Sequence, residues 1–175
     1  MPEQGRVLDL GSGGGLPGLV LATYRPELEL TLLEARQRAC RFLREAVATL
    51  EMTRVTVVEA RAEDAARRPE LRESFDAVVA RSFGPPAVTA ECAVGFLRRA
   101  GRLLVSEPPG EEEGDAEPGR QGDRWPQPGL DVLGLSGPAP GGGAGVSFVL
   151  MEKTRADDRW PRRTGVPAKR PLWTV

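Results

Sequence analysis

The sequence predicts an α/β fold in which a mostly parallel, seven-stranded sheet carries helices on both faces. Five short apolar segments alternate with longer segments of helical character, and this order builds parallel β-α-β units. The apolar segments are rich in Val and Leu with little alternation of polarity, which is typical of strands buried on both faces. The expected strands of the parallel part cover residues 6–10, 29–34, 54–59, 75–80 and 102–106.

Helices are expected between these strands. The clearest covers residues 36–50, where apolar side chains from Ala39 to Leu50 recur at spacings of three and four. A first helix over residues 17–24 begins at Pro17, a residue suited to the first turn of a helix. The remaining helices are expected over residues 62–67 and 86–98.

The composition changes after the fifth strand. Residues 107–129 are rich in Pro, Gly and Glu and are expected to form a flexible acidic loop. Residues 130–135 and 146–153 are expected to close the sheet as a pair of strands, joined by a Gly/Pro-rich connection over 136–145. Residues 155–175 form a basic C-terminal tail, and the 175 residues together are the size of a single domain.

Composition excludes several classes of function. The chain has no histidine, which rules out every mechanism that needs an imidazole base. Its two cysteines, Cys40 and Cys92, match no metal or redox spacing, so no metal is expected. No apolar segment approaches the roughly 20 residues that span a bilayer, and no signal peptide is visible. We therefore expect a cytoplasmic monomer without a membrane partner.

Charge is distributed unevenly although the net charge is only −1. Residues 107–123 hold seven acids against one base, a local charge of −6. Residues 153–170 hold seven bases against two acids, a local charge of +5. A basic segment of this kind can bind phosphates.

The strongest local signal is a glycine-rich loop, DLGSGGGLPG, over residues 9–18. It follows the first strand, at the carboxyl edge where parallel sheets bind ligands, and glycine lets a ligand approach the backbone closely. A dinucleotide fingerprint that starts at Gly11 would need glycine where Leu16 stands. The acid-x-G-x-G-x-G pattern of S-adenosylmethionine-binding enzymes fits Asp9, Gly11, Gly13 and Gly15.

Acidic residues follow the next two strands. Glu34 ends the second strand, where a carboxylate can accept both ribose hydroxyls of an adenosine, although it could also be a helix cap or a solvated charge. Glu63 lies just past the third strand, where it could meet an adenine amino group beside the backbone of Ala62. The alternative for Glu63 is an early-helix acid that favours the helix dipole. Asp9 would suit the positive charges of the methionine part of the cofactor.

Together these segments resemble the RsmG (GidB) family of bacterial small-subunit rRNA methyltransferases. The first and last of the matching segments are the most diagnostic. The matches are VLDLGSGGGLPG (7–18), RPELELTLLEA (25–35), RACRFL (38–43), RAED (61–64), FDAVVARSF (75–83) and WPRRTGVPAKRPL (160–172).

The resemblance implies a Rossmann-like, class I methyltransferase fold. It also implies methyl transfer from S-adenosylmethionine to N7 of a guanine in 16S rRNA, with the rRNA or the small ribosomal subunit as partner. With the glycine loop included, the expected cofactor-binding residues are Asp9, Gly11, Ser12, Gly13, Gly15, Leu16, Glu34, Ala62, Glu63 and Arg81. The expected RNA-binding residues are Arg162, Arg163, Lys169 and Arg170.

Methylation at guanine N7 fits a chain without histidine. This nitrogen carries no proton, so no general base is needed and catalysis can rest on positioning and electrostatics. Arg81 and Phe83 are the candidates for positioning: Phe83 could stack on a base, or it could belong to the core. The basic tail could lie along rRNA, or it could be a strap whose Trp160, Leu172 and Trp173 pack on the sheet while its arginines stay solvated.

The chain departs from the family pattern in two places. Six residues precede Val7, where family members carry a helical lead, and Glu107 stands where they usually carry a lysine after the fifth strand. These departures keep two alternatives open: a related methyltransferase with another acceptor, and a relative that binds cofactor or ribosome without turnover.

Overall fold

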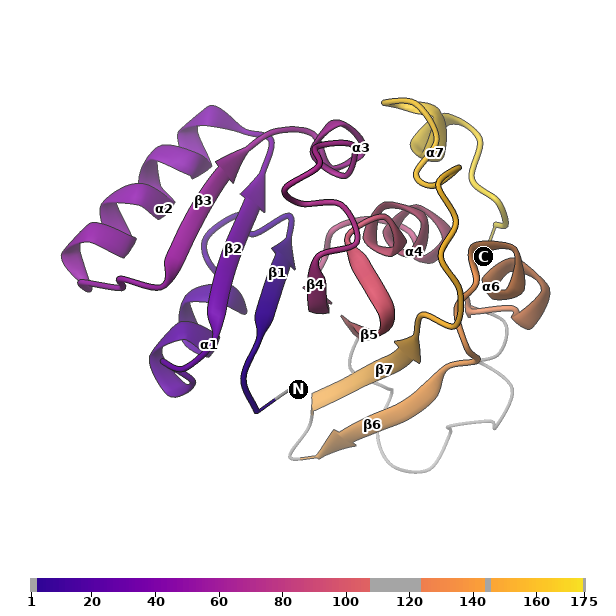
Figure 1. Cartoon of the computed structure of the whole chain (residues 1–175), viewed down its shortest axis with the longest axis horizontal. Helices are drawn as coiled ribbons and strands as arrows, with labels where there is room; N and C mark the ends of the chain where they lie inside the picture. The colour runs from indigo at the N-terminus through magenta and orange to yellow at the C-terminus, as the bar shows by residue number, and fades with distance from the viewer. Residues whose placement is uncertain (1–2, 108–123, 144–145, 175) are drawn as a thin grey trace.

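The computed structural model describes residues 3–107, 124–143 and 146–174. Seven strands form one sheet in the order β3-β2-β1-β4-β5-β7-β6 (Figure 1). β1 to β5 are parallel, and β7 runs antiparallel to both β5 and β6. The strands are β1 (Arg6–Leu10), β2 (Glu29–Glu34), β3 (Val55–Glu59), β4 (Phe75–Ala80), β5 (Leu97–Ser106), β6 (Ala139–Gly143) and β7 (Val146–Glu152). The predicted α/β class and mostly parallel sheet are confirmed.

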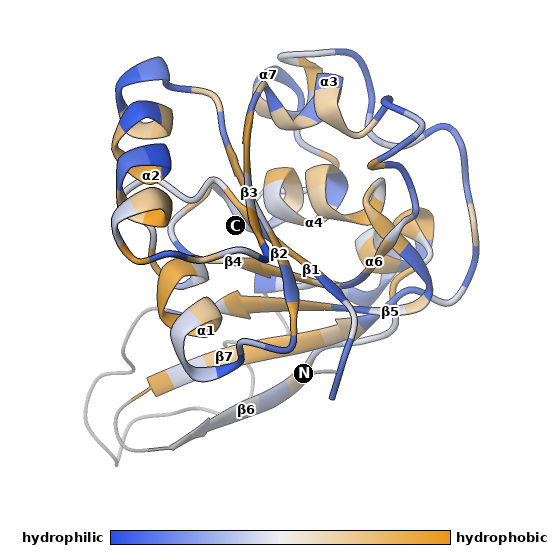
Figure 2. Cartoon of the chain, turned by 60° about the vertical axis from the view of Figure 1, so that its left-hand side comes forward, coloured by the Kyte–Doolittle hydropathy of each residue, from blue (hydrophilic) through white to orange (hydrophobic). Residues whose placement is uncertain are grey.

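Helices cover both faces of the sheet. In Figure 2, α1 and α2 lie on one side of the strands, and α3, α4, α6 and α7 lie on the other. The bounds of these helices are α1 (Gly18–Tyr24), α2 (Gln37–Thr49), α3 (Ala62–Ala65), α4 (Pro86–Val94), α6 (Gln127–Leu133) and α7 (Val166–Lys169). Crossovers of this kind place the carboxyl ends of β1 to β4 at one edge of the sheet, where ligands of such folds bind.

Two apolar clusters explain why polar and apolar side chains do not alternate along the strands. The larger lies under α3, α4 and α6, where the rings of Phe75 and Phe96 meet edge to face with centroids 6.2 Å apart. The smaller lies under α1 and includes Val7, Leu30 and Val79. Because β1, β2 and β4 contribute to both clusters, their side chains are apolar on both faces.

The strand expected over residues 130–135 is wrong, because residues 130–133 belong to helix α6 and only Leu135 forms an isolated β-bridge, to Lys153. Leu130 and Leu133 are three residues apart and both are buried, which is a helical spacing. Pro126 precedes the helix, and Gly134 ends it in the left-handed conformation that glycine tolerates. The edge strand β6 lies instead in the expected Gly/Pro-rich connection, since a ladder needs only backbone groups.

Other boundaries also differ from the sequence expectation. Helix α4 ends at Val94 rather than at residue 98, and β5 begins at Leu97 rather than at residue 102. Of the expected acidic loop over 107–129, residues 108–123 lie outside the described residues. Residues 124–129 are not a loop throughout, since Trp125 is only 1 % exposed and α6 begins at Gln127.

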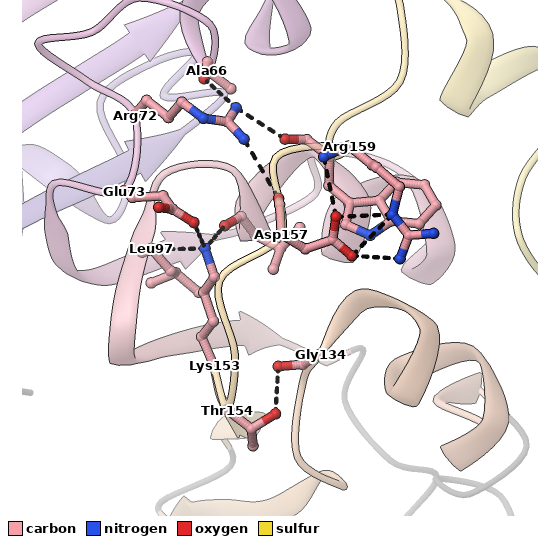
Figure 3. Close-up of polar contacts among 11 residues, drawn as sticks. Ala66, Arg72, Glu73, Leu97, Gly134, Lys153, Thr154, Asp157 and Arg159 are labelled. Atoms are coloured by element: carbon pink, nitrogen blue, oxygen red, sulfur yellow. Dashed lines mark hydrogen bonds and ion pairs between the residues drawn. The ribbon is translucent and has the colours of Figure 1, made fainter.

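A buried lysine directly after β7 contacts Glu73, the end of α4 and the start of β5 (Figure 3). The side chain of Lys153 is 1 % exposed, and its Nζ donates to Oε1 of Glu73 at 2.6 Å. The same Nζ donates to the carbonyl oxygens of Val94, at 3.1 Å, and Leu97, at 2.8 Å. Lys153 therefore satisfies the last carbonyl of α4, where a cation is favourable, and the first carbonyl of β5.

A buried carboxylate joins β1 to helix α1. Asp9 is 1 % exposed, and its Oδ2 accepts a 3.0 Å hydrogen bond from the backbone N–H of Gly18. A Cβ at position 18 would lie 2.5 Å from that oxygen, so the close approach requires glycine. Burial, with a smaller contribution from the charge of Glu34, raises the pKa of Asp9 from 3.8 to about 6.

We expect Lys153→Met to lower the free energy of unfolding by about 2–4 kcal/mol, because a carboxylate and two carbonyls lose their donor. Lys169→Met is the matched control: it removes the other lysine from an exposed position and should change stability by less than about 0.5 kcal/mol. Urea denaturation of both variants measures the difference. Equal unfolding midpoints would show that the buried ammonium contributes nothing.

We expect the pH dependence of stability to change in Asp9→Asn. Because the folded state raises the pKa of Asp9, its contribution is fully present below pH 4 and is lost as pH rises from about 4 to about 6. Asparagine keeps an acceptor for Gly18 but cannot ionise. Between pH 4 and 7, the free energy of unfolding of the variant should gain up to about 3 kcal/mol relative to wild type, measured by urea denaturation. Parallel pH profiles would contradict this assignment.

Candidate functional site

A cavity of about 490 Å³ lies at the carboxyl edge of the sheet. Gly11 of the glycine loop forms one wall, and the segment 33–36 at the end of β2 forms the next. Residues 60–63 after β3 and 82–85 after β4 complete the rim. The cavity thus brings together the loops that follow four different strands, which is the usual ligand position in such sheets.

The glycine loop owes its shape to backbone conformations that favour glycine. Gly11, Gly13 and Gly15 have φ angles of +74°, +53° and +92°. A Cβ on Gly11 would lie 2.5 Å from Cδ2 of Phe83, so the loop and this ring touch closely. The loop is held against β2 because the N–H groups of Gly11 and Ser12 both donate to the carbonyl of Leu33, at 2.9 and 3.0 Å.

The other predicted loop residues do not line this cavity. Asp9 is directed toward the start of α1, as described above, and Ser12 is buried with its Oγ donating to the carbonyl oxygen of Asp9. Leu16 is half-exposed at the far end of the loop. Among the expected loop residues that the structure describes, Gly11 alone faces the cavity, and the others shape the loop or extend from it.

Glu34 is the best-organised acid of the cavity. It is 6 % exposed, and its Oε1 accepts from the N–H groups of Ala35 and Arg36, at 2.9 and 2.8 Å. Its Oε2 accepts from the N–H of Gly13 at 2.9 Å. Burial alone would raise the pKa of Glu34, but the hydrogen bonds from Arg36 and Gly13 outweigh it and hold the pKa below its ordinary value. Glu34 is therefore an ionised acceptor at neutral pH.

Ala62 and Glu63 form the other end of the same cavity, in the first turn of α3. Glu63 is 4 % exposed, and its Oε1 accepts a 2.9 Å hydrogen bond from the N–H of Gly165 in the C-terminal segment. Its Oε2 lies 3.9 Å from Nε of Arg61. The contact with Gly165 was not expected from the sequence, because it joins residues 102 positions apart.

A second cavity, of about 940 Å³, adjoins the first over β4 and β5. Phe83 lines both cavities, as do its neighbours Ser82 and Gly84. Arg81, at the end of β4, is exposed and lines the second cavity, and it forms no hydrogen bond or ion pair with another described residue. The predicted pair Arg81 and Phe83 is thus placed where the two cavities meet.

An ion pair at the second cavity was missed by the sequence reading. Oε2 of Glu107 lies 2.7 Å from Nε of Arg124, and Oε1 accepts from Nε1 of the buried Trp125 at 3.0 Å. The acid that stands in place of the family lysine is therefore neutralised by Arg124. The isolated Trp125 within a polar, Pro- and Gly-rich segment was the available signal for a buried contact.

The basic C-terminal residues fall into two groups. Arg162 is engaged within the protein, since its Nε and one terminal nitrogen donate to the two oxygens of the fully buried Glu91, at 2.8 and 2.6 Å. Arg163, Lys169 and Arg170 are exposed. The aromatic residues of this segment are buried or half-buried against the larger core, as a strap would be; these are Trp160 and Trp173, together with Leu172.

The described part of the chain contains no group of three or more residues arranged to hold a metal ion. None of its helices is long and apolar enough to cross a membrane.

Solved structures with this fold include methyltransferases. A SAM-dependent methyltransferase from Aquifex aeolicus superimposes with a TM-score of 0.64 at 15 % identity, covering 86 % of this chain and 82 % of that one. The S-adenosylmethionine-dependent methyltransferase SibL gives a TM-score of 0.64 at 20 % identity, covering 86 % and 50 %. At such identities the likeness establishes the Rossmann-like, class I fold.

Sequence relatives are more specific. Ribosomal RNA small subunit methyltransferase G of Moorella thermoacetica is 35 % identical over 179 residues, which cover 98 % of this chain and 71 % of the relative. The protein of the same name from Symbiobacterium thermophilum is 40 % identical over 177 residues, covering 95 % and 70 %. The family profile GidB, described as rRNA small subunit methyltransferase G, matches residues 1–113. The chain therefore belongs to the GidB family of S-adenosylmethionine-dependent rRNA small subunit methyltransferases.

Proposed function

We propose that this chain methylates N7 of a guanine in 16S rRNA, within the small ribosomal subunit and in the cytoplasm. The observation that carries the proposal is the junction at Phe83, where a cavity suited to S-adenosylmethionine opens beside a second cavity large enough for a base. The names of the relatives support an rRNA acceptor. S-adenosylmethionine, when bound, supplies a methyl group on a sulfonium cation.

The residues of the first cavity fit this cofactor. Glu34 offers an ionised, buried carboxylate to the ribose hydroxyls, and Gly11 allows the ring of Phe83 to pack against the loop at the border of the cavity. Glu63 keeps one oxygen beyond its bond to Gly165 for an adenine amino group. The volume of about 490 Å³ lies within the range of small-molecule sites.

The remaining predicted residues would act around these cavity-lining residues. Asp9, Ser12, Gly13 and Gly15 hold the glycine loop in shape, so we assign them an indirect part in cofactor binding. Leu16 and the exposed guanidinium of Arg81 would border the methionine end, where Arg81 can pair with a carboxylate or an RNA phosphate.

The second cavity suits a base that needs no deprotonation. Phe83 presents an aromatic wall on which a guanine can stack, and the apolar side chains of Leu21 and Leu104 exclude water. Because N7 of guanine carries no proton, holding its lone pair toward the first cavity is sufficient, and no acid-base residue is required. Among the exposed cations, Arg163, Lys169 and Arg170 would contact the RNA backbone, with an affinity that falls as salt rises.

Glu34→Gln is expected to weaken binding of S-adenosylhomocysteine about 10- to 100-fold, because a charged acceptor for the ribose is lost. Glu29→Gln, at the exposed opposite end of the same strand, is the matched control and should leave the affinity unchanged. Titration calorimetry measures both. Wild-type affinity in a folded Glu34→Gln protein would remove Glu34 from the cofactor site.

Phe83→Ala is expected to reduce kcat/KM for RNA methylation about tenfold or more, since stacking on a base contributes about 1–3 kcal/mol. Phe83→Tyr preserves the ring and should retain most of the activity. The assay follows transfer of a labelled methyl group to small subunits that lack the modification, at saturating cofactor. Equal rates for wild type and Phe83→Ala would mean that this ring only packs against the core.

A further inference from the structure

The C-terminal segment, residues 155–174, reaches the cavity that we assign to the cofactor. Ala168, in α7, lines this cavity together with residues that lie more than 70 positions earlier in the chain. Figure 2 shows α7 beside α3, on the face of the sheet that also carries α4. The segment is thus placed against the end of the cavity formed by Ala62 and Glu63, which is the adenine end in the proposed function.

Long arginine side chains from the body of the protein hold the beginning of this segment. Arg67 donates to the carbonyl oxygen of Pro161 at 2.9 Å. Arg72 donates to the carbonyl oxygen of Trp160 at 3.2 Å, and also to that of Asp157 (Figure 3). These contacts satisfy backbone carbonyls that a free tail would leave to water.

A buried ion pair fixes the next part. The fully buried carboxylate of Glu91 accepts three hydrogen bonds from Arg162, one from its backbone N–H at 2.9 Å and two from its guanidinium. This pairing raises the pKa of Arg162, so its charge is permanent. The guanidinium of Arg162 also donates to the carbonyl oxygen of Arg170 at 2.8 Å. This bond joins the residues on either side of the part that contains α7.

Helix α3 holds the part that meets the cavity. Glu63 accepts from the N–H of Gly165, as described above, and Asp64 accepts from the hydroxyl of Thr164. Gly165 has a φ of +78°, and this turn leads directly into α7 and Ala168. Glu63 therefore lines the cavity and holds the segment at the same time.

We propose that residues 164–168 form the adenine-end wall of the cofactor site, and that this wall links cofactor binding to RNA binding. The link exists because the exposed cations Arg163, Lys169 and Arg170 flank the wall on the same short segment. A ligand that fills the cavity fixes the wall, and hence the positions of these cations. The inference rests on the proposed function and adds Gly165 and Ala168 to the residues of the cofactor site.

The wall is tested by two variants and a control, titrated with S-adenosylhomocysteine by calorimetry after thermal melts have shown that each is folded. Ala168→Leu adds bulk at the cavity. Gly165→Pro removes the N–H that Glu63 accepts and also disrupts the turn into α7, because proline cannot adopt a φ of +78°. Either variant should weaken binding about tenfold or more. Ala48→Leu makes the same substitution at an exposed position of α2 outside the cavity and should bind as wild type does.

Wild-type affinity in both folded variants would contradict the proposal that residues 164–168 form a wall of the cofactor site. If the folded wild-type protein does not bind S-adenosylhomocysteine, the proposed function fails as well, and the two failures are therefore distinguishable.

The link to RNA is tested with a 16S rRNA transcript, titrated with and without saturating S-adenosylhomocysteine. We expect about tenfold tighter RNA binding with the ligand, and the same factor in ligand affinity when RNA is saturating, since coupling is reciprocal. Gly165→Pro should abolish this ligand-dependent increase in RNA affinity. Arg163→Ala should weaken RNA binding but keep the increase. An RNA affinity that does not respond to the ligand in the wild-type protein would overturn the link.

Discussion

The carboxyl edge of this protein depends on how the glycine loop is held against the end of β2. The carbonyl of Leu33 accepts the N–H groups of Gly11 and Ser12, and the carboxylate of Glu34 accepts that of Gly13. These bonds fix a turn that bulky residues could not adopt, because its glycines have positive φ angles. The same carboxylate then faces the cavity. One short contact between two strand ends thus shapes the loop and orients the carboxylate that we propose as the acceptor for a ribose.

Phe83 extends this arrangement from the cofactor to the acceptor. Its ring lies against Gly11, so the loop after β4 is positioned by the loop after β1. The ring also lines both cavities, and the exposed Arg81 lines the second. In the proposed function, a methyl group passes from one cavity to the other at this boundary. The residues around it provide an aromatic surface and a cation rather than a base, which agrees with an acceptor nitrogen that carries no proton.

Features that depend on local sequence were predictable. Continuous Val/Leu segments located the parallel strands, and the spacing of Asp9, Gly11, Gly13 and Gly15 located the loop, while Leu16 argued against a dinucleotide fingerprint that starts at Gly11. The segment over residues 130–135 was misassigned, because a short apolar stretch fits a buried strand and a helix equally well by periodicity alone. The Pro126 and Gly134 that flank the helix were the usable signals.

Features that depend on distant residues were not predictable. Lys153 was counted with the basic tail, yet its partners Glu73 and Leu97 lie at least 56 positions away. Arg162 was expected to contact RNA, but its guanidinium is held by Glu91, an acid with no local sequence signal. In both cases burial of a charge required a partner, and only the packing of the chain determines which partner is near.

We propose that this rRNA methyltransferase acts on guanine N7. The most direct measurement is nucleoside mass spectrometry of small-subunit RNA that lacks the modification, after incubation with the protein and isotope-labelled S-adenosylmethionine. We expect labelled 7-methylguanosine at a single position of 16S rRNA. Labelled methyl groups on another nucleoside, or none in the RNA despite cofactor binding, would contradict it.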